Sequence, residues 1–588
     1  NSQGGVISAR NSIDILSANL DNSQQGSIKS DAGITLDGGQ LNNSQQGSIF
    51  AKSTVNATLT GLDQHDRGEL VSNTGINLNL NHGVLINRNR GLIATPGQLL
   101  LSNLGVVDNS QGGEISSTQS FVLAADSLNN RGGKVISADS LQLHVAHALD
   151  NSVKGVLSAQ NVLQVATASL DNRSGGALAS HGDLNLKVEG VLDNRNQGLI
   201  TAATTLEVAS GSLNNSDKGR LFAGAHQTLN TGALDNRQGG SLASDGSMIV
   251  TAGNVDNREG VIGSQRALNL TTADLENSAG LINSQGDLAL AGQHVTSSQG
   301  GEISAKGDLE LTVQQLIQRQ GRLVGERAVA IDLQGGDLDN RGGLIRANGP
   351  LTFARLVALT NREHGEISSQ NAFTLGAKHI DNGDRGVILS TDQLRLEAGH
   401  VVNSDHGLIS GWNGLKVIGD SLDNSVQGTL SSKDGTLQVV LTDALDNHDA
   451  GALVSQGKQH VSAASLNNNQ GIISGQDDLT LSIAGGLDNS NDGLISSARD
   501  LDFNHVRTEL SNRNGKVNAA NITLTGRSVD NSAGQLISQG TLKGTLSGAL
   551  INANNARLAS GAALLLNAAS LDNRGGQLAS QDQLDLTL

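Results

Sequence analysis

The stretch LDNSQQGSIKSDAGITLDGGQ, from Leu20 to Gln40, recurs in recognisable form along the whole chain. Its leading signature, Leu-Asp-Asn or a near variant, returns about every 21 residues, for instance at residues 149–151 and 571–573. A fixed period of this length is typical of a solenoid, in which each repeat packs only against its neighbours. The sequence therefore predicts one elongated repeat structure rather than several compact domains.

The apolar residues of one repeat follow the pattern of β-strands. Ile34-Thr35-Leu36 alternates apolar and polar residues with a period of two, and no part of the repeat sustains a helical period. Clusters of Asn, Asp, Ser and Gly separate the short apolar runs and mark turns. We therefore expect an all-β parallel β-helix solenoid with three short strands in each coil of about 21 residues and about 27 coils. At a strand spacing of roughly 4.8 Å, these coils would form a rod on the order of 130 Å long.

Stacking places equivalent residues of successive coils in columns. A single coil buries too little apolar surface to balance the entropy lost on ordering its residues, so its stability must come from its neighbours. One predicted aliphatic column contains Leu20, Leu41, Leu62, Leu85, Leu128 and Leu149, and a second contains Ile7, Ile28, Ile49, Leu70, Ile93 and Ile115.

The third signature position is Asn in nearly every repeat. We predict a structural ladder, in which stacked Asn side chains donate and accept hydrogen bonds from coil to coil. Asn also tolerates a left-handed backbone at a bend. A glycine three or four residues later, as at Gly26 and Gly47, is expected to supply a positive φ. The predicted ladder residues are Asn22, Asn43, Asn87, Asn109, Asn130, Asn151, Asn172, Asn194, Asn215, Asn236 and Asn257.

The composition fits one elongated domain that covers residues 1–588. The chain contains 74 Gly, 2 Pro and no Cys, and only one Trp and six Phe, so the core is expected to be aliphatic and free of disulfides. It begins and stops inside a repeat, and neither end resembles the cap that a solenoid needs over its open strand edges. We therefore expect an excerpt of a longer chain, uncapped at both ends.

The charge distribution argues against nucleic acid or an anionic membrane surface as the main partner. The formal net charge is −17, and the charged residues are spread over the repeats without a basic block. No run of 18 apolar residues is present, so we expect no insertion of this segment into a membrane.

Candidate catalytic and metal-binding residues are sparse. Long loops and aromatic residues, which a polysaccharide-cleaving β-helix needs around its carboxylates, are nearly absent, so we expect neither an enzyme nor a cofactor. The second signature position forms a possible carboxylate column, which either binds bridging cations or is a solvated face neutralised by the arginines that follow it. The column contains Asp150, Asp171, Asp193, Asp235, Asp256 and Glu276, and the arginines are Arg173, Arg195, Arg237 and Arg258.

Two local features stand out from the regular repeats. Trp412 lies in a turn, Gly411-Trp412-Asn413-Gly414, where it either packs on a neighbouring coil or contacts a partner such as a sugar. The signature also degrades at residues 295–297 and 316–318, which lack the Asp-Asn pair. An irregular coil is a place where a solenoid bends or recruits a partner, or it reflects sequence drift without consequence.

The units resemble the repeats of filamentous haemagglutinin-type exoproteins, which Gram-negative bacteria secrete through the two-partner pathway. The matching pattern is L-D-N-x-x-x-G-x-[IL]-x-[SA], as in LDNRSGGALAS from Leu170 to Ser180 and in LDNSNDGLISSARDLDF from Leu487 to Phe503. The resemblance covers nearly the whole chain and implies a right-handed β-helix on the cell surface. It also implies an outer-membrane transporter as the partner during secretion. No secretion domain, receptor-binding segment or toxin module of that group is recognisable in the sequence.

We expect a non-catalytic, rigid stalk or filament segment of a secreted, surface-displayed exoprotein. The parent would be either an effector of contact-dependent growth inhibition or a haemagglutinin-type adhesin, and target-cell receptors or glycans would bind regions outside this segment. The alternative is that the rod itself is an adhesin with repeated weak sites for glycans, matrix or host cells, made effective by multivalency.

Overall fold

The computed structural model describes residues 1–588, apart from the side chains of residues 505, 506 and 508. The described residues form strands, turns and bends and no helix, so none forms a helix that is long and apolar enough to cross a membrane. The strands pair in parallel as a β-solenoid of about 28 coils, which confirms the predicted fold class. Two compact units can be distinguished: unit 1, Asn1–Gly292, and unit 2, Gln293–Leu588.

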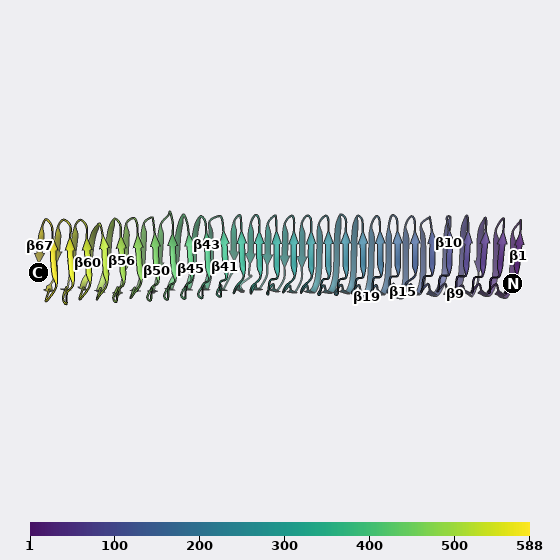
Figure 1. Ribbon diagram of the computed structural model, residues 1–588, viewed down its shortest axis with the longest axis horizontal. Coiled ribbons are helices and arrows are strands. Elements are labelled where there is room, and N and C mark those ends of the chain that lie inside the picture. Colours follow the sequence, from purple (N-terminus) through teal and green to yellow (C-terminus); the bar gives the residue numbers. More distant parts are fainter. The chain divides into compact units, whose positions relative to one another are not determined.

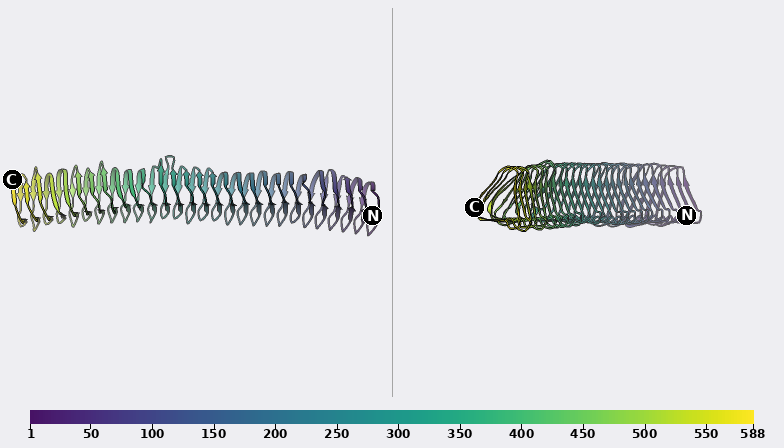
Figure 2. Two further views of the ribbon diagram at one scale, coloured as in Figure 1. Left: turned by 90° about the horizontal axis from the view of Figure 1, so that it is seen from above. Right: turned by 60° about the vertical axis from the view of Figure 1, so that its left-hand side comes forward.

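Each coil contributes one short strand and one long, bent strand, and each pairs with its equivalent in the next coil. In unit 1, short strand β3 (Ser27–Ser30) pairs in register with β5 (Ser48–Ala51). The long strand β4 (Ile34–Asn42) pairs with β6 (Thr54–Thr58) and β7 (Gly61–Asp63). Within each unit the strands therefore lie side by side, one coil after another (Figures 1 and 2).

The expected three strands per coil are present where the bend interrupts the long strand. In unit 2, β33 (Leu309–Thr312) and β34 (Gln315–Ile317) are separate strands. In other coils extended backbone continues through the bend, with register shifts such as those between β9 (Gly75–Ile86) and β11 (Gln98–Asp108). The bend is therefore the place where a coil accommodates an additional residue.

The two predicted aliphatic columns are present in the interior. Ile28, Ile49 and Leu70 pair in direct register and are almost completely buried. The column of signature leucines is also in register, and Val107 occupies it between Leu85 and Leu128. Burial of such side chains contributes roughly 1.5–3 kcal/mol each, and only neighbouring coils provide it.

The turn after the signature has a left-handed backbone, but at positions other than those predicted. In the turn Ser23–Gly26, Gly26 N donates to Ser23 O at 3.1 Å, and the central residues Gln24 and Gln25 have φ of 51° and 66°. These features define a type I′ turn. Neither the ladder asparagines nor Gly26 and Gly47 are among the described residues with positive φ, so the expected conformational role of both was wrong.

The glycine that closes this turn is required for close packing instead. A Cβ atom on Gly240 would lie 2.5 Å from the backbone oxygen of Asn215 in the preceding coil and 2.6 Å from Asn236 Oδ1. The same contacts recur along both units, for example at Gly407 against Asn382 and Asn403. A side chain at this position requires two successive coils to shift at the ladder, and Ala556, which closes the turn after Asn552, is a position where the chain carries one.

Two adjacent glycines separate the steric requirement from the conformational one. We expect Gly240→Ala to destabilise its coil by the upper part of the roughly 1–3 kcal/mol that overpacking costs, or more. Gly239 has φ +77°, and the nearest atom to its added Cβ is Lys218 Cγ at 3.5 Å, so Gly239→Ala should cost only about 1–2 kcal/mol. Native-state hydrogen exchange of the coil measures both. Equal effects, or a larger effect at Gly239, would contradict the packing role.

Candidate functional site

The asparagine side chains of the third signature position form the most regular polar feature of the interior. In unit 1, Asn22 Nδ2 donates to Asn43 Oδ1 at 2.7 Å, and Asn236 Nδ2 donates to Asn257 Oδ1 at 2.7 Å. Most of these amides also donate to a backbone carbonyl of their own turn and to one of the next coil, as Asn236 does to Gly240 and Val261. All of these side chains are fully buried.

The hydrogen-bonded series extends beyond the predicted ladder residues. Gln64 substitutes for Asn: it accepts from Asn43 at 3.3 Å and donates to Asn87 at 3.0 Å. In unit 1 the series continues to Asn277. In unit 2 it contains Asn340, Asn361, Asn382, Asn403, Asn424, Asn447, Asn468, Asn489, Asn512, Asn531, Asn552 and Asn573.

The series is interrupted at Gln318, in one of the two irregular signatures. Gln318 is fully buried, yet neither its side-chain nitrogen nor its oxygen has a hydrogen-bond partner among the described residues. The Oδ1 atom of Asn340, on the next coil, is also without a partner. A buried amide without partners is destabilising, because it has lost its hydration without compensation. This coil is therefore a weak point of the ladder in unit 2.

The carboxylate column of the second signature position is bridged by arginine. Arg237 donates to both carboxylate oxygens of Asp235, at 2.9 and 2.8 Å, and its Nε lies 3.4 Å from Asp256 on the next coil. Arg173 makes the same contacts with Asp171 and Asp193. Burial raises the pKa of the Asp235 carboxyl, but hydrogen bonds from the Arg237 side chain and backbone outweigh it, and the pKa lies below its ordinary value. Arginines thus neutralise four carboxylates of the column, Asp171, Asp193, Asp235 and Asp256.

Trp412 follows β45 (Leu408–Gly411) in unit 2 and lies in the turn that precedes β46 (Gly414–Asp423). Its side chain is 43% exposed, and the ammonium group of Lys433, from the next coil, lies 4.3 Å from the ring centroid. A cation over an indole face at this distance is attracted by the ring quadrupole. The ring is thus in contact with a neighbouring coil, while part of it faces solvent.

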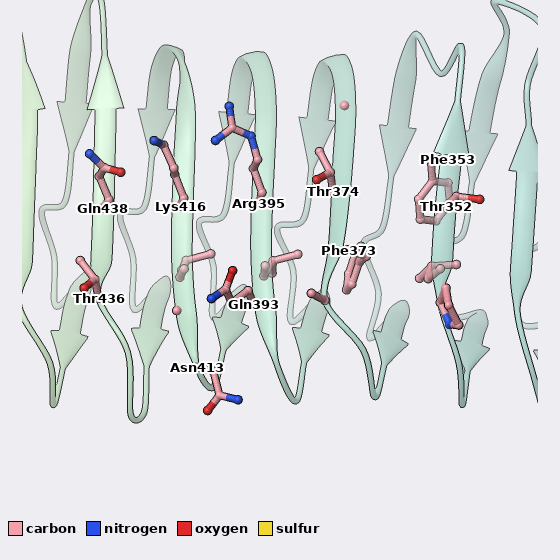
Figure 3. A pocket seen from close by; sticks show the side chains of 17 residues that line it. Thr352, Phe353, Phe373, Thr374, Gln393, Arg395, Asn413, Lys416, Thr436 and Gln438 are labelled. Carbon is pink, nitrogen blue, oxygen red and sulfur yellow. The ribbon is translucent and has the colours of Figure 1, made fainter.

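A groove with a volume of about 750 Å³ lies beside Trp412 on the outer face of unit 2. Thr374, Arg395, Lys416 and Gln438 form its floor, one from each of four successive coils (Figure 3). Gln393, Asn413 and Thr436 line one side, and Phe353 lies at one end. The sequence analysis did not identify this groove, because outward positions on strands carry no periodic signal; two phenylalanines on adjacent coils, Phe353 and Phe373, were the available signal.

Comparison with known proteins identifies the repeats. A family model described as "Haemagglutinin repeat" matches eight overlapping segments that together extend from residue 144 to residue 587: residues 144–237, 208–292, 293–357, 343–431, 402–449, 434–503, 483–549 and 543–587. No curated protein and no solved structure matches the chain.

The ladder can be tested with a matched pair of substitutions in unit 2. Asn403→Leu removes the acceptor of Asn382 and the donor to Asn424, Gly407 and Thr429. We expect a cost of roughly 1–3 kcal/mol for each buried group left without a partner. Gln318→Leu should be neutral or stabilising, because Gln318 makes no side-chain hydrogen bond. Native-state hydrogen exchange of the affected coils measures both, and a similar cost at both positions would show that the ladder bonds do not stabilise the coils.

The acid–arginine edge predicts a dependence of stability on pH. Because the folded pKa of Asp235 lies below its unfolded value near 3.8, the stabilisation is fully present above that value. It is lost as the pH falls through the folded pKa. Thermal unfolding of unit 1 should therefore occur at lower temperature below about pH 4, and Asp235→Asn should reduce this dependence while lowering the unfolding temperature at pH 7. An unchanged acid dependence in the variant would contradict the assignment.

Proposed function

Because the chain belongs to the haemagglutinin repeat family, we propose that it is a non-catalytic, stiff spacer segment of a secreted, surface-displayed exoprotein. Haemagglutinin repeats on a parallel β-solenoid fit a segment of an adhesin-type exoprotein, and this family is structural or adhesive rather than catalytic. The spacer holds a distal region away from the cell. That region is the receptor-binding part of an adhesin or the delivery part of a contact-dependent growth inhibition effector.

The observation that carries this proposal is the repeated hydrogen bonding inside each unit. Successive coils are joined by parallel strand pairing and by the asparagine series, which extends from Asn22 to Asn277 in unit 1 and from Asn340 to Asn573 in unit 2. Bending a unit would lengthen these bonds on one side, and the buried amides have no water to replace them. Each coil adds one strand spacing of roughly 4.8 Å, so reach increases with the number of coils.

The composition supports secretion through an outer-membrane transporter as part of the same proposal. The chain has no Cys, so no disulfide forms before or during passage through a pore in the unfolded state. Each coil is stabilised mainly by its neighbour, so folding can proceed coil by coil as the chain emerges. Folding outside the cell then prevents the segment from sliding back through the transporter.

A change in coil number tests the spacer function. Deletion of residues 447–488 removes two coils of unit 2 and brings Asn489 into the ladder position of Asn447. We expect intact folding, a segment shorter by about 10 Å in electron cryomicroscopy, and reduced activity of the distal region of the exoprotein.

A matched exchange is the control. Replacing residues 447–488 with residues 215–256, which form two coils of equal length in unit 1, preserves length but changes the surface. A spacer retains full activity after this exchange. Loss of activity in the exchanged protein with its length preserved would contradict the proposal and indicate sequence-specific binding by these coils.

A further inference from the structure

One end of the groove of unit 2 lies where the regular pairing of strands is interrupted, whereas its floor lies on strands that pair in direct register. Strand β39 (Leu351–Ala354) pairs with β36 (Val329–Asp332) of the preceding coil. Among the described strands, no pairing joins β39 to β42 (Phe373–Asp381) of the following coil, although the adjoining strands of the same two coils are paired. Figure 3 shows a wider separation between these two strands than between their neighbours.

Two aromatic rings lie at the interruption. Phe353 and Phe373 lie on adjacent coils at inward positions, where most coils have aliphatic side chains. Phe373 is buried, whereas Phe353 remains half-buried at the end of the groove. Overpacking of an interior of fixed width displaces backbone. The displaced strands leave backbone N–H and C=O groups at the groove that no strand pairing satisfies, and such groups bind polar ligands.

The floor of the groove presents polar side chains at a constant spacing. Thr374, Arg395, Lys416 and Gln438 are in direct register on successive strands, so they are separated by roughly 4.8 Å per coil. The side chains of Thr374 and Gln438, and those of Gln393 and Thr436 beside them, make no hydrogen bond with any described residue. This arrangement suits a linear ligand that lies along the coil stack and carries many hydroxyl groups.

The charge of the floor is weakly positive. Arg395 forms an ion pair with Glu397 on its own strand, which neutralises most of its charge. Lys416 is half-buried and forms no ion pair with any described residue. Because this half-buried ammonium group has no carboxylate partner, the position favours a ligand that carries a carboxylate.

We propose that this groove binds a linear polysaccharide with sparsely spaced carboxylates, and that Lys416 pairs with one uronic acid carboxylate. The hydroxyl and amide groups of Thr374, Gln393, Thr436 and Gln438 bind the sugar hydroxyls, and Phe353 contacts the apolar face of a ring. A densely sulfated polyanion does not fit, because it requires a cluster of basic residues. The site adds local recognition to a segment whose other coils act as spacer.

The test is a titration of the whole 588-residue chain with three hexasaccharides, in which saturation-transfer NMR measures binding. Hyaluronan hexasaccharide carries one carboxylate per disaccharide, chitohexaose carries none, and a heparin hexasaccharide is densely sulfated. We expect hyaluronan hexasaccharide to bind best. Lys416→Gln should lower its affinity about tenfold, as for the loss of one charge-assisted hydrogen bond. Thr374→Phe, which fills the floor from an exposed position, should abolish binding.

Lys543 provides the matched control. It occupies the same outward position on β61 (Leu542–Leu546) as Lys416 does on β46, is exposed, and does not line the groove. Lys543→Gln should leave the affinity unchanged. Absence of hyaluronan binding, an equal loss in both lysine variants, equal binding of chitohexaose, or tighter binding of heparin would each overturn the proposal. Circular dichroism of each variant confirms that folding is retained.

Discussion

The buried asparagine amide of the third signature position is the interaction on which each unit depends. An amide inside an apolar interior is destabilising unless its donors and its acceptor all have partners. Here the partners come from three places: the equivalent amide of the next coil, a carbonyl of the same turn and a carbonyl of the next coil. Two of the three, the amide and the carbonyl of the next coil, do not exist in an isolated coil. Except where the series is interrupted at Gln318, the polar interior therefore couples successive coils more specifically than the aliphatic columns do.

This coupling explains which parts of a repeat are constant and which vary. The separation between successive ladder residues ranges from 19 residues, Asn512 to Asn531, to 23 residues, Asn424 to Asn447. The distance from Nδ2 to Oδ1 is nevertheless 2.7 Å in both cases. Length differences are accommodated in the turn and at the bend of the long strand, where bulges form. The turn carries glycine in nearly every coil because the preceding coil lies close to this position, and Ala556 is an exception.

The sequence predicted the fold class, the coil length and the buried columns, because a pattern repeated in every coil is averaged over the whole chain. It predicted the backbone of the signature turn incorrectly. Asn and Gly are the residues that favour positive φ, but here Gln24 and Gln25 adopt it, and Asn22 and Gly26 serve packing and hydrogen bonding instead. Features that occur in only one coil were not predictable in detail. The irregular signature at Gln318 was visible, whereas its unpartnered amide, and the groove at the unpaired strands β39 and β42, depend on contacts between particular coils.

Regular coils and local defects thus have different consequences. The regular coils resist bending, while at the interruption strands β39 and β42 of unit 2 are unpaired beside one end of the groove. The acid–arginine edge in unit 1 neutralises its own charges from coil to coil. The proposed recognition combines a polar floor on regularly paired coils with an aromatic end at the interruption.

The most direct measurement is the rate at which asparagine side-chain amide hydrogens exchange with solvent, monitored by NMR of the selectively labelled chain. The account predicts that the Nδ2 hydrogens of interior ladder residues such as Asn194 and Asn215 exchange as slowly as the backbone amides of the same coils. Those of the exposed Asn269 should exchange rapidly. Rapid exchange at the ladder positions in a folded chain would show that these hydrogen bonds do not join the coils and would contradict the central claim.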